Sequence, residues 1–114
     1  MKETIGIELT RLASQFVNIY LAEAEEENYP YAVYTSDVTP VYTKDGIHHY
    51  EASVSLTVFS KDLDTCDQIS DSIDSAISEN MTRRPYISFK TSDSKDCDEG
   101  IWSRTMNFTI KQFS

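Results

Sequence analysis

Two cysteines and an adjacent pair of histidines are the residues whose types could carry nucleophilic or metal chemistry. Cys66 falls within the apolar stripe of a predicted helix, so we expect a small buried side chain, and catalysis by it would need a histidine brought close by the fold. His48 and His49 follow a predicted turn, and neighbouring strand residues point to opposite faces, so both cannot chelate one ion from a regular strand. His49 shares its face with Glu51, which could form a zinc pair, but a solvated polar stripe is the simpler interpretation. We predict no metal site at these residues.

An acidic segment, residues 93–100, carries carboxylates of the kind that bind calcium. Read from Asp96, however, the pattern meets glycine at the fifth position and Asn107 at the twelfth, where a calcium loop requires a bidentate glutamate. We therefore interpret the segment as a solvated loop between two strands. The sequence also lacks the G-x-S-x-G, H-E-x-x-H, Walker and dinucleotide-binding motifs. These observations predict a protein that is not an enzyme and binds no cofactor.

The composition is that of one ordinary globular domain. The chain has 114 residues, of which 39% are hydrophobic and 25% charged, so we expect a single domain over residues 1–114. Its net charge of -9 opposes binding to DNA phosphates, and no stretch approaches the roughly 20 apolar residues of a membrane span. With two cysteines and no signal segment, we interpret the protein as intracellular, with reduced thiols and no specific nucleic-acid or membrane partner.

A helix and a long hairpin are predicted for the first half of the chain. Apolar residues recur at spacings of three and four from Lys2 to about Glu26, which indicates an amphipathic helix. A strand is expected from Tyr31 to Tyr42, where Pro40 marks an edge strand or a bulge, and Lys44-Asp45-Gly46 supplies the turn. The return strand has one buried and one solvated face, because its apolar residues alternate with polar ones. These apolar residues are Tyr50, Ala52, Val54, Leu56 and Val58.

The second half of the chain predicts another helix followed by two strands. Ser60 or Asp62 can cap a helix that ends near Ile77. Strands are expected from Tyr86 to Thr91 and along an alternating face from Trp102 to Ile110. The buried stripe of the helix comprises Leu63, Cys66, Ile69, Ile73, Ala76 and Ile77, whereas Asp64, Asp67, Asp71 and Asp74 point away from it. The order α-β-β-α-β-β indicates the α+β class, with an antiparallel sheet and two helices packed on one face.

Two surface features suggest contacts with protein partners. Tyrosines are frequent along the first hairpin strand, and aromatic side chains are favoured at protein interfaces. Carboxylates follow at the end of the predicted first helix, where the helix dipole disfavours negative charge, so they are either fully solvated or matched by a basic partner surface. The tyrosines are Tyr29, Tyr31, Tyr34 and Tyr42, and the carboxylates are Glu23, Glu25, Glu26 and Glu27.

Several segments together resemble a known family. They are the stretch Tyr29 to Tyr34, the Lys44-Asp45-Gly46 turn, the strand from Tyr50 to Phe59, and a helix with Asp67, Ile69, Ile73 and Ile77. In these segments the chain resembles the tail-completion, or tail-terminator, proteins of long-tailed bacteriophages and prophages. The resemblance extends over residues 5–113 in element order and is strongest from Tyr29 to Ile77.

The resemblance implies a structural virion-assembly protein. Such subunits form an oligomeric ring, typically a hexamer, which caps the finished tail tube and joins it to the head connector. The family brings no catalytic residues, and it places the protein in the bacterial host cytoplasm during assembly and then in the virion tail. Its ring lumens tend to be negative, which the charge of -9 fits.

For the ring contacts we predict the hairpin Tyr42 to Ile47, the loop 93–100 and three arginines. The hairpin residues are Tyr42, Lys44, Asp45 and Ile47. Arg83, Arg84 and Arg104 of one subunit are expected to pair with Glu23, Glu25, Glu26 and Glu27 of a neighbour. The tail tube protein and the head connector are the further partners that the resemblance implies.

Two other functions are compatible with the sequence. The first is a small monomeric or dimeric binding module, in which the exposed sheet face or the tyrosine strand holds a peptide or a small ligand. The second, ranked lower, is a small enzyme that uses Cys66 or Cys97 with His48 or His49.

Overall fold

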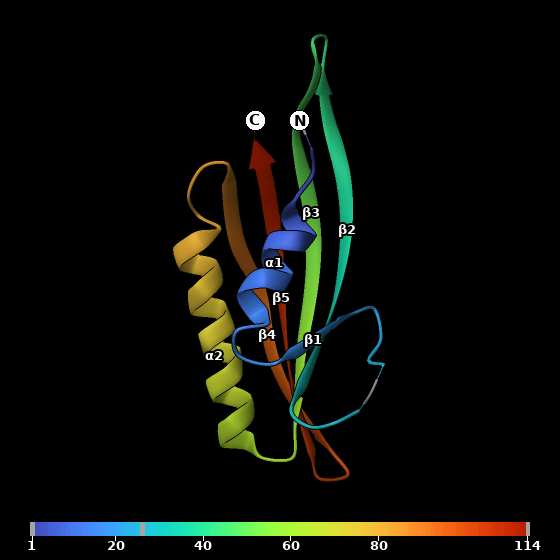
Figure 1. The fold of residues 1–114 in the computed structure, drawn as a ribbon, viewed down its shortest axis with the longest axis vertical. Coiled ribbons are helices and arrows are strands. Elements are labelled where there is room, and N and C mark those ends of the chain that lie inside the picture. The colour runs from blue at the N-terminus through green and yellow to red at the C-terminus, as the bar shows by residue number, and fades with distance from the viewer. Residues whose placement is uncertain (1, 26, 114) are drawn as a thin grey trace.

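The computed structural model describes residues 2–25 and 27–113, which form an α+β fold with helices on one face of a sheet (Figure 1). The elements are α1 (Ile5–Ala13), β1 (Asn18–Leu21), β2 (Tyr31–Thr43), β3 (Gly46–Ser60), α2 (Leu63–Asn80), β4 (Tyr86–Asp98) and β5 (Ile101–Phe113). The predicted fold class is confirmed, and the predicted order of elements is found with one additional strand, β1.

The sheet is built from two long hairpins joined side by side. Its strand order is β1-β2-β3-β5-β4, and all neighbours are antiparallel except β1, which runs parallel to β2. The predicted antiparallel sheet is therefore correct for the two hairpins and incomplete at the β1 edge. The long strands give the molecule principal extents of 52 × 25 × 22 Å.

One face of the sheet carries the core. Val54 lies opposite Phe108 and Leu56 opposite Met106 across β3 and β5, and all four side chains are buried. The core continues through apolar residues of both helices: Ile5, Leu9 and Leu12 of α1, and Cys66, Ile73 and Ile77 of α2. Both helices therefore cover the same face, as predicted, and the opposite face of the sheet, here called the open face, is left without a helix (Figure 1).

Helix α2 begins where the sequence predicts. The Asp62 carboxylate accepts hydrogen bonds from the Thr65 backbone N–H at 2.9 Å and from its hydroxyl at 2.8 Å, so it satisfies one of the first free amides. The stripe from Cys66 to Ile77 is buried, with Ser70 as an additional buried member. The helix ends at Asn80, directly before the basic turn that contains Arg83.

The prediction of a first helix from Lys2 to about Glu26 is wrong beyond Ala13. Residues 18–21 form β1, in which Asn18 lies beside Tyr31 and Leu21 beside Tyr34. Val17, Ile19 and Tyr20 are β-branched or aromatic, so they favour extended backbone. Parallel pairing with β1 also provides hydrogen-bond partners for backbone groups at the start of β2. Apolar residues in a turn followed by a short strand can recur at the same spacings of three and four as the apolar residues of a helix.

The predicted loop at residues 92–100 is also wrong. Strand β4 continues to Asp98, and only Glu99 and Gly100 form the turn, with φ of +50° and +79°. Two positive φ values match the type I′ hairpin turn. The strand lacks an apolar face because the side chains that it directs towards α2 form ion pairs, so no hydrophobic alternation marks it in the sequence.

The predicted hairpin of β2 and β3 is confirmed. Its turn is Lys44-Asp45, followed by Gly46 at φ +114°, and a bulge interrupts the register next to Val41. Pro40 lies beyond the part of β2 that pairs with β1, so its missing N–H removes no hydrogen bond from that side of the described sheet.

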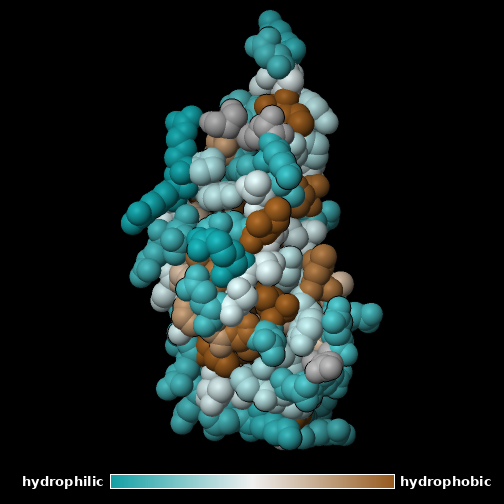
Figure 2. Space-filling model, viewed as in Figure 1, coloured by the Kyte–Doolittle hydropathy of each residue, from teal (hydrophilic) through white to brown (hydrophobic). Residues whose placement is uncertain are grey.

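The helix-covered face is hydrophilic at both ends and has separate apolar patches along the middle (Figure 2). Ile7 of α1 and Phe16, which follows this helix, are 67% and 40% exposed. Within the residues described, no helix combines the length and hydropathy needed to cross a membrane.

Candidate functional site

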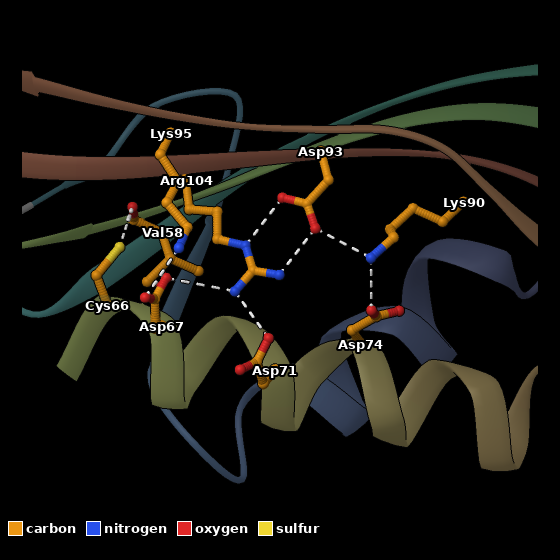
Figure 3. Close-up of polar contacts among 9 residues, drawn as sticks. All are labelled: Val58, Cys66, Asp67, Asp71, Asp74, Lys90, Asp93, Lys95 and Arg104. Carbon is orange, nitrogen blue, oxygen red and sulfur yellow. Dashed lines mark hydrogen bonds and ion pairs between the residues drawn. The ribbon is translucent and has the colours of Figure 1, made fainter. Parts of the chain in front are cut away.

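The most extensive polar contact in the described chain joins α2 to the β4–β5 hairpin (Figure 3). Arg104 donates from Nε to Asp93 Oδ1 at 2.9 Å, from one terminal nitrogen to Asp93 Oδ2 at 2.8 Å, and from the other to Asp71 at 2.7 Å. Lys90 bridges Asp74 and Asp93 at 2.8 and 3.0 Å. We call this set the ionic cluster; its members are Asp67, Asp71, Asp74, Lys90, Asp93, Lys95 and Arg104.

A bulge in β4 makes the ionic cluster possible. In a regular strand Lys90 and Asp93 would face opposite sides of the sheet. The register shifts between Lys90 and Ser92, so Lys90 lies opposite Phe108 while Asp93 lies opposite Met106, and both partners belong to the core face. The shift therefore directs both charged side chains towards the acidic side of α2.

Electrostatics fixes the protonation of the ionic cluster. Hydrogen bonds from Arg104, assisted by Lys90, hold the pKa of Asp93 well below its usual range although partial burial opposes this. Hydrogen bonds to Asp93 and Asp71 likewise raise the pKa of Arg104, whose side chain is only 9% exposed. The cluster is a charged clamp between a helix and an edge strand.

The ionic cluster changes the interpretation of Arg104 and of the acidic face of α2. From the sequence we expect Arg104 to pair with glutamates of a neighbouring subunit, but in the structure its Nε and both terminal nitrogens donate to carboxylates of its own chain. Asp67, Asp71 and Asp74 point away from the apolar stripe, as predicted. They do not face solvent alone, because each forms an ion pair with a side chain of β4 or β5. Lys90 and Asp93 were not assignable from sequence, because their contact depends on the bulge.

The tip of the β2–β3 hairpin is the most prominent exposed feature. It extends beyond the rest of the molecule (Figure 1). Tyr42 and Ile47 lie directly opposite each other across the hairpin and are 67% and 36% exposed. Lys44 and Asp45 form the turn between them. The four predicted hairpin contact residues thus share one accessible surface, although their contact with a second copy stays a prediction.

The two histidines do not point to opposite faces, because the bulge lies at His48. Val41 pairs with His49 and Tyr42 with Ile47, which leaves His48 as the extra residue of β3. The Nδ1 atoms of the two rings are 2.7 Å apart, and both rings pack against Phe113. The strand argument that separates the two rings is therefore wrong. Within the described residues no three metal-ligating side chains form a group.

The acidic segment between β1 and β2 lies in the half of the molecule away from the hairpin tip (Figure 1). Because α1 ends at Ala13, Glu23, Glu25 and Glu27 belong to the segment between β1 and β2, and the helix-dipole argument does not apply to them. Glu26 lies outside the described residues. Arg83 and Arg84 lie in the turn between α2 and β4, in the half of the molecule that carries the hairpin tip (Figure 1). Contact between these two groups in neighbouring copies would require copies that are offset along the long axis or that run in opposite directions.

The structure does not bring either cysteine close to the histidines. Cys66 is buried in the first turn of α2, where its thiol donates to the Val58 carbonyl at 3.6 Å and burial raises its pKa. Val58 is nine residues along β3 from His49, which is about 30 Å of strand. Cys97 is exposed and lies opposite Trp102, near the same distant end of the sheet.

Three comparisons place the fold among known proteins. No protein family matches the chain, and no curated protein matches it. Among solved structures, the chain is similar to one from the virion of a native gene transfer agent (GTA) particle. The likeness has a TM-score of 0.58 at 12% sequence identity, and it covers 93% of this chain and 84% of the other. At this identity the similarity establishes a shared fold.

Proposed function

We propose that the chain is a structural subunit of a phage-like virion, in which it completes the tail. The observation that carries this proposal is the likeness to a chain of the gene transfer agent particle over 93% of the residues. The resemblance of the segment Tyr29 to Ile77 to tail-completion proteins adds the finer role: a ring that caps the tail tube and joins it to the head connector. The role involves no catalytic step and places the protein in the host cytoplasm and then in the virion tail.

Two strand edges, one on β4 and one on the part of β2 beyond β1, support assembly into a ring. Along β4, and along β2 from Thr35 to Thr43, one edge carries no neighbouring strand within the described sheet. Such edges present unpaired N–H and C=O groups. β2 and β4 run in opposite directions, so rotation about an axis parallel to the strands would bring β4 of one copy antiparallel to β2 of the next. Closure of such a head-to-tail contact gives a ring.

The surface of the open face suits the inside of such a ring. Its central rows are hydroxyl and amide side chains, including a hydrogen bond of 2.9 Å between Thr57 and Thr105. Such a polar surface, with the carboxylate of Asp37 beside these rows and further carboxylates at one end, would let DNA pass without adhering.

The test is the mass of the protein in solution. We expect a discrete species near six times 13.0 kDa by light scattering after size exclusion, formed more completely as protein concentration rises, and visible as rings by electron microscopy. A particle of 13.0 kDa at every concentration and salt would contradict self-assembly and favour a monomeric binding module.

A pair of substitutions asks whether the hairpin tip takes part. The double variant Tyr42→Asp with Ile47→Asp should need about tenfold more protein to assemble, because burial of these exposed apolar side chains would be lost. Leu21→Asp is the matched control, since Leu21 is 63% exposed but lies on β1. Equal effects of the two changes would remove the tip from the contact without affecting the ring itself.

A further inference from the structure

Three aromatic rings form a stack on the open face, near the β4–β5 turn. Tyr31 stacks on Phe59 with ring centroids 5.1 Å apart, and Tyr29 packs on Tyr31 at 5.4 Å. Burial raises the pKa of the Tyr31 hydroxyl, and the charge of Glu27 and contact with Tyr29 raise it further. The rings are closely packed and partly accessible through Tyr29 and Phe59.

A hollow beside the stack follows from the register of four strands. Tyr31 pairs with Phe59, Phe59 with Ser103, and Ser103 with Asp96, so these residues form one row across the sheet. Phe59 and Asp96 are two strand spacings apart, or about 10 Å, with only the small Ser103 between them. The resulting hollow has a volume of about 380 Å³.

The rim of the hollow is acidic. Besides Asp96, it is lined by Glu27, Asp98 and Glu99. None of these four carboxylates forms an ion pair within residues 2–25 and 27–113, in contrast to the carboxylates of the ionic cluster on the other side of the sheet. The ammonium of Lys61 already lies 5.7 Å from the ring centroid of Tyr29, so this aromatic group accommodates a cation in the folded chain.

We propose that this hollow binds the guanidinium or ammonium group of a basic segment in a different protein. An aromatic wall opposite a carboxylate provides both cation–π attraction and charge pairing for such a group. The carboxylates exclude a phosphate or a carboxylate ligand. A second copy is the weaker occupant, because each copy carries a net charge of -9, which opposes the approach of another copy to this acidic surface. The inference rests on the proposed function for its partner, another virion protein.

The test uses a short peptide, acetyl-Gly-Arg-Gly-Arg-Gly-amide, and its counterpart with neutral citrulline in place of arginine. We expect the arginine peptide to shift the amide NMR signals of Phe59, Asp96 and Ser103, and the citrulline peptide to leave them unchanged. Asp96→Asn and Tyr29→Leu should each weaken binding by about two- to fivefold. Asp45→Asn, which removes an exposed carboxylate at the hairpin tip, is the matched control and should bind as the unaltered protein does.

Each result decides the inference independently of the ring. Equal binding of both peptides, or equal loss in Asp96→Asn and Asp45→Asn, would show diffuse attraction to an acidic surface and overturn the site. Light scattering on Asp96→Asn provides the second readout, since assembly should be unchanged. If assembly is lost in this variant, the occupant is a second copy, which overturns the assignment to a different protein while the proposed ring stands.

Discussion

The two long hairpins of the sheet have similar lengths but are held in place by different interactions. The β2–β3 hairpin lies on the core through apolar residues such as Val54 and Leu56, and its tip is free. In the other hairpin β5 likewise packs on the core through Met106 and Phe108, whereas β4 has no buried residue and is fixed through Arg104 and the ionic cluster. An edge strand can therefore be positioned by charge where it buries no apolar face.

The largest expected effect comes from removing the centre of the ionic cluster. Arg104→Met keeps the apolar part of the side chain but leaves Asp71 and Asp93 without their main cation. We expect a loss of about 2–3 kcal/mol in the free energy of unfolding, less than for fully buried pairs because these carboxylates are partly solvated. Urea denaturation measures the loss.

Arg11→Met supplies the matched control for this change. Arg11 also pairs with a carboxylate, that of Glu8, but its side chain is 56% exposed, so we expect no measurable loss of stability. Equal losses in the two variants would show that Arg104 contributes no more to stability than an exposed ion pair does.

A second prediction concerns pH. Because the pKa of Asp93 is lower in the folded state than in the unfolded chain, its contribution to stability is complete above the unfolded value and decreases as the pH falls towards the folded value. The free energy of unfolding decreases as the pH falls from about 5 to about 2, and in Asp93→Asn this decrease should be smaller by about 1–2 kcal/mol. Urea denaturation at several pH values tests this, and an unchanged acid slope would show that Asp93 does not carry the effect.

The smallest effect is expected at the turn of the β4–β5 hairpin. Glu99 has φ +50°, a left-handed conformation that asparagine tolerates better than glutamate does. Glu99→Asn should therefore raise the free energy of unfolding by about 0.5–1 kcal/mol. Asp45→Asn makes the same type of change in the other hairpin turn, where the positive φ belongs to Gly46, and should have no effect. Thermal denaturation compares them, and a loss of stability in Glu99→Asn would contradict the argument.

The same difference explains which strands could be predicted from the sequence. Alternation of apolar and polar residues identified β3 and β5, because one of their faces is buried in the core. The end of β4 resembles a loop in the sequence because its inward residues are charged: Asp93 pairs with Arg104 of β5, and Lys95 pairs with Asp67 of α2. Hydrophobic patterning does not report contacts of this kind.

The beginning of the chain was mispredicted for another reason. Phe16, Ile19 and Tyr20 continue the spacing of α1, so a short helix followed by a short strand has the pattern of one long helix. Pairing of β1 with β2 joins residues that are thirteen positions apart, such as Asn18 and Tyr31, and local propensity does not contain that information.

The candidate contact residues were partly accessible to sequence reasoning. The exposed tip with Tyr42 and Ile47 follows from the turn, whereas the aromatic hollow depends on the alignment of Tyr31, Phe59, Ser103 and Asp96 across four strands. Register over several strands, and bulges such as the one at His48, are properties of the assembled sheet.

The separation of charge along the molecule acts before any contact forms. The acidic segment around Glu27 and the turn at Glu99 lie in one half of a 52 Å body, and Arg83 lies in the other half (Figure 1). Because this length exceeds the Debye length of about 8 Å at physiological salt several times over, a charged surface interacts with the nearer end alone. The resulting torque turns the acidic end towards a basic surface during diffusion, which raises the rate of productive encounter and makes that rate fall as salt is added.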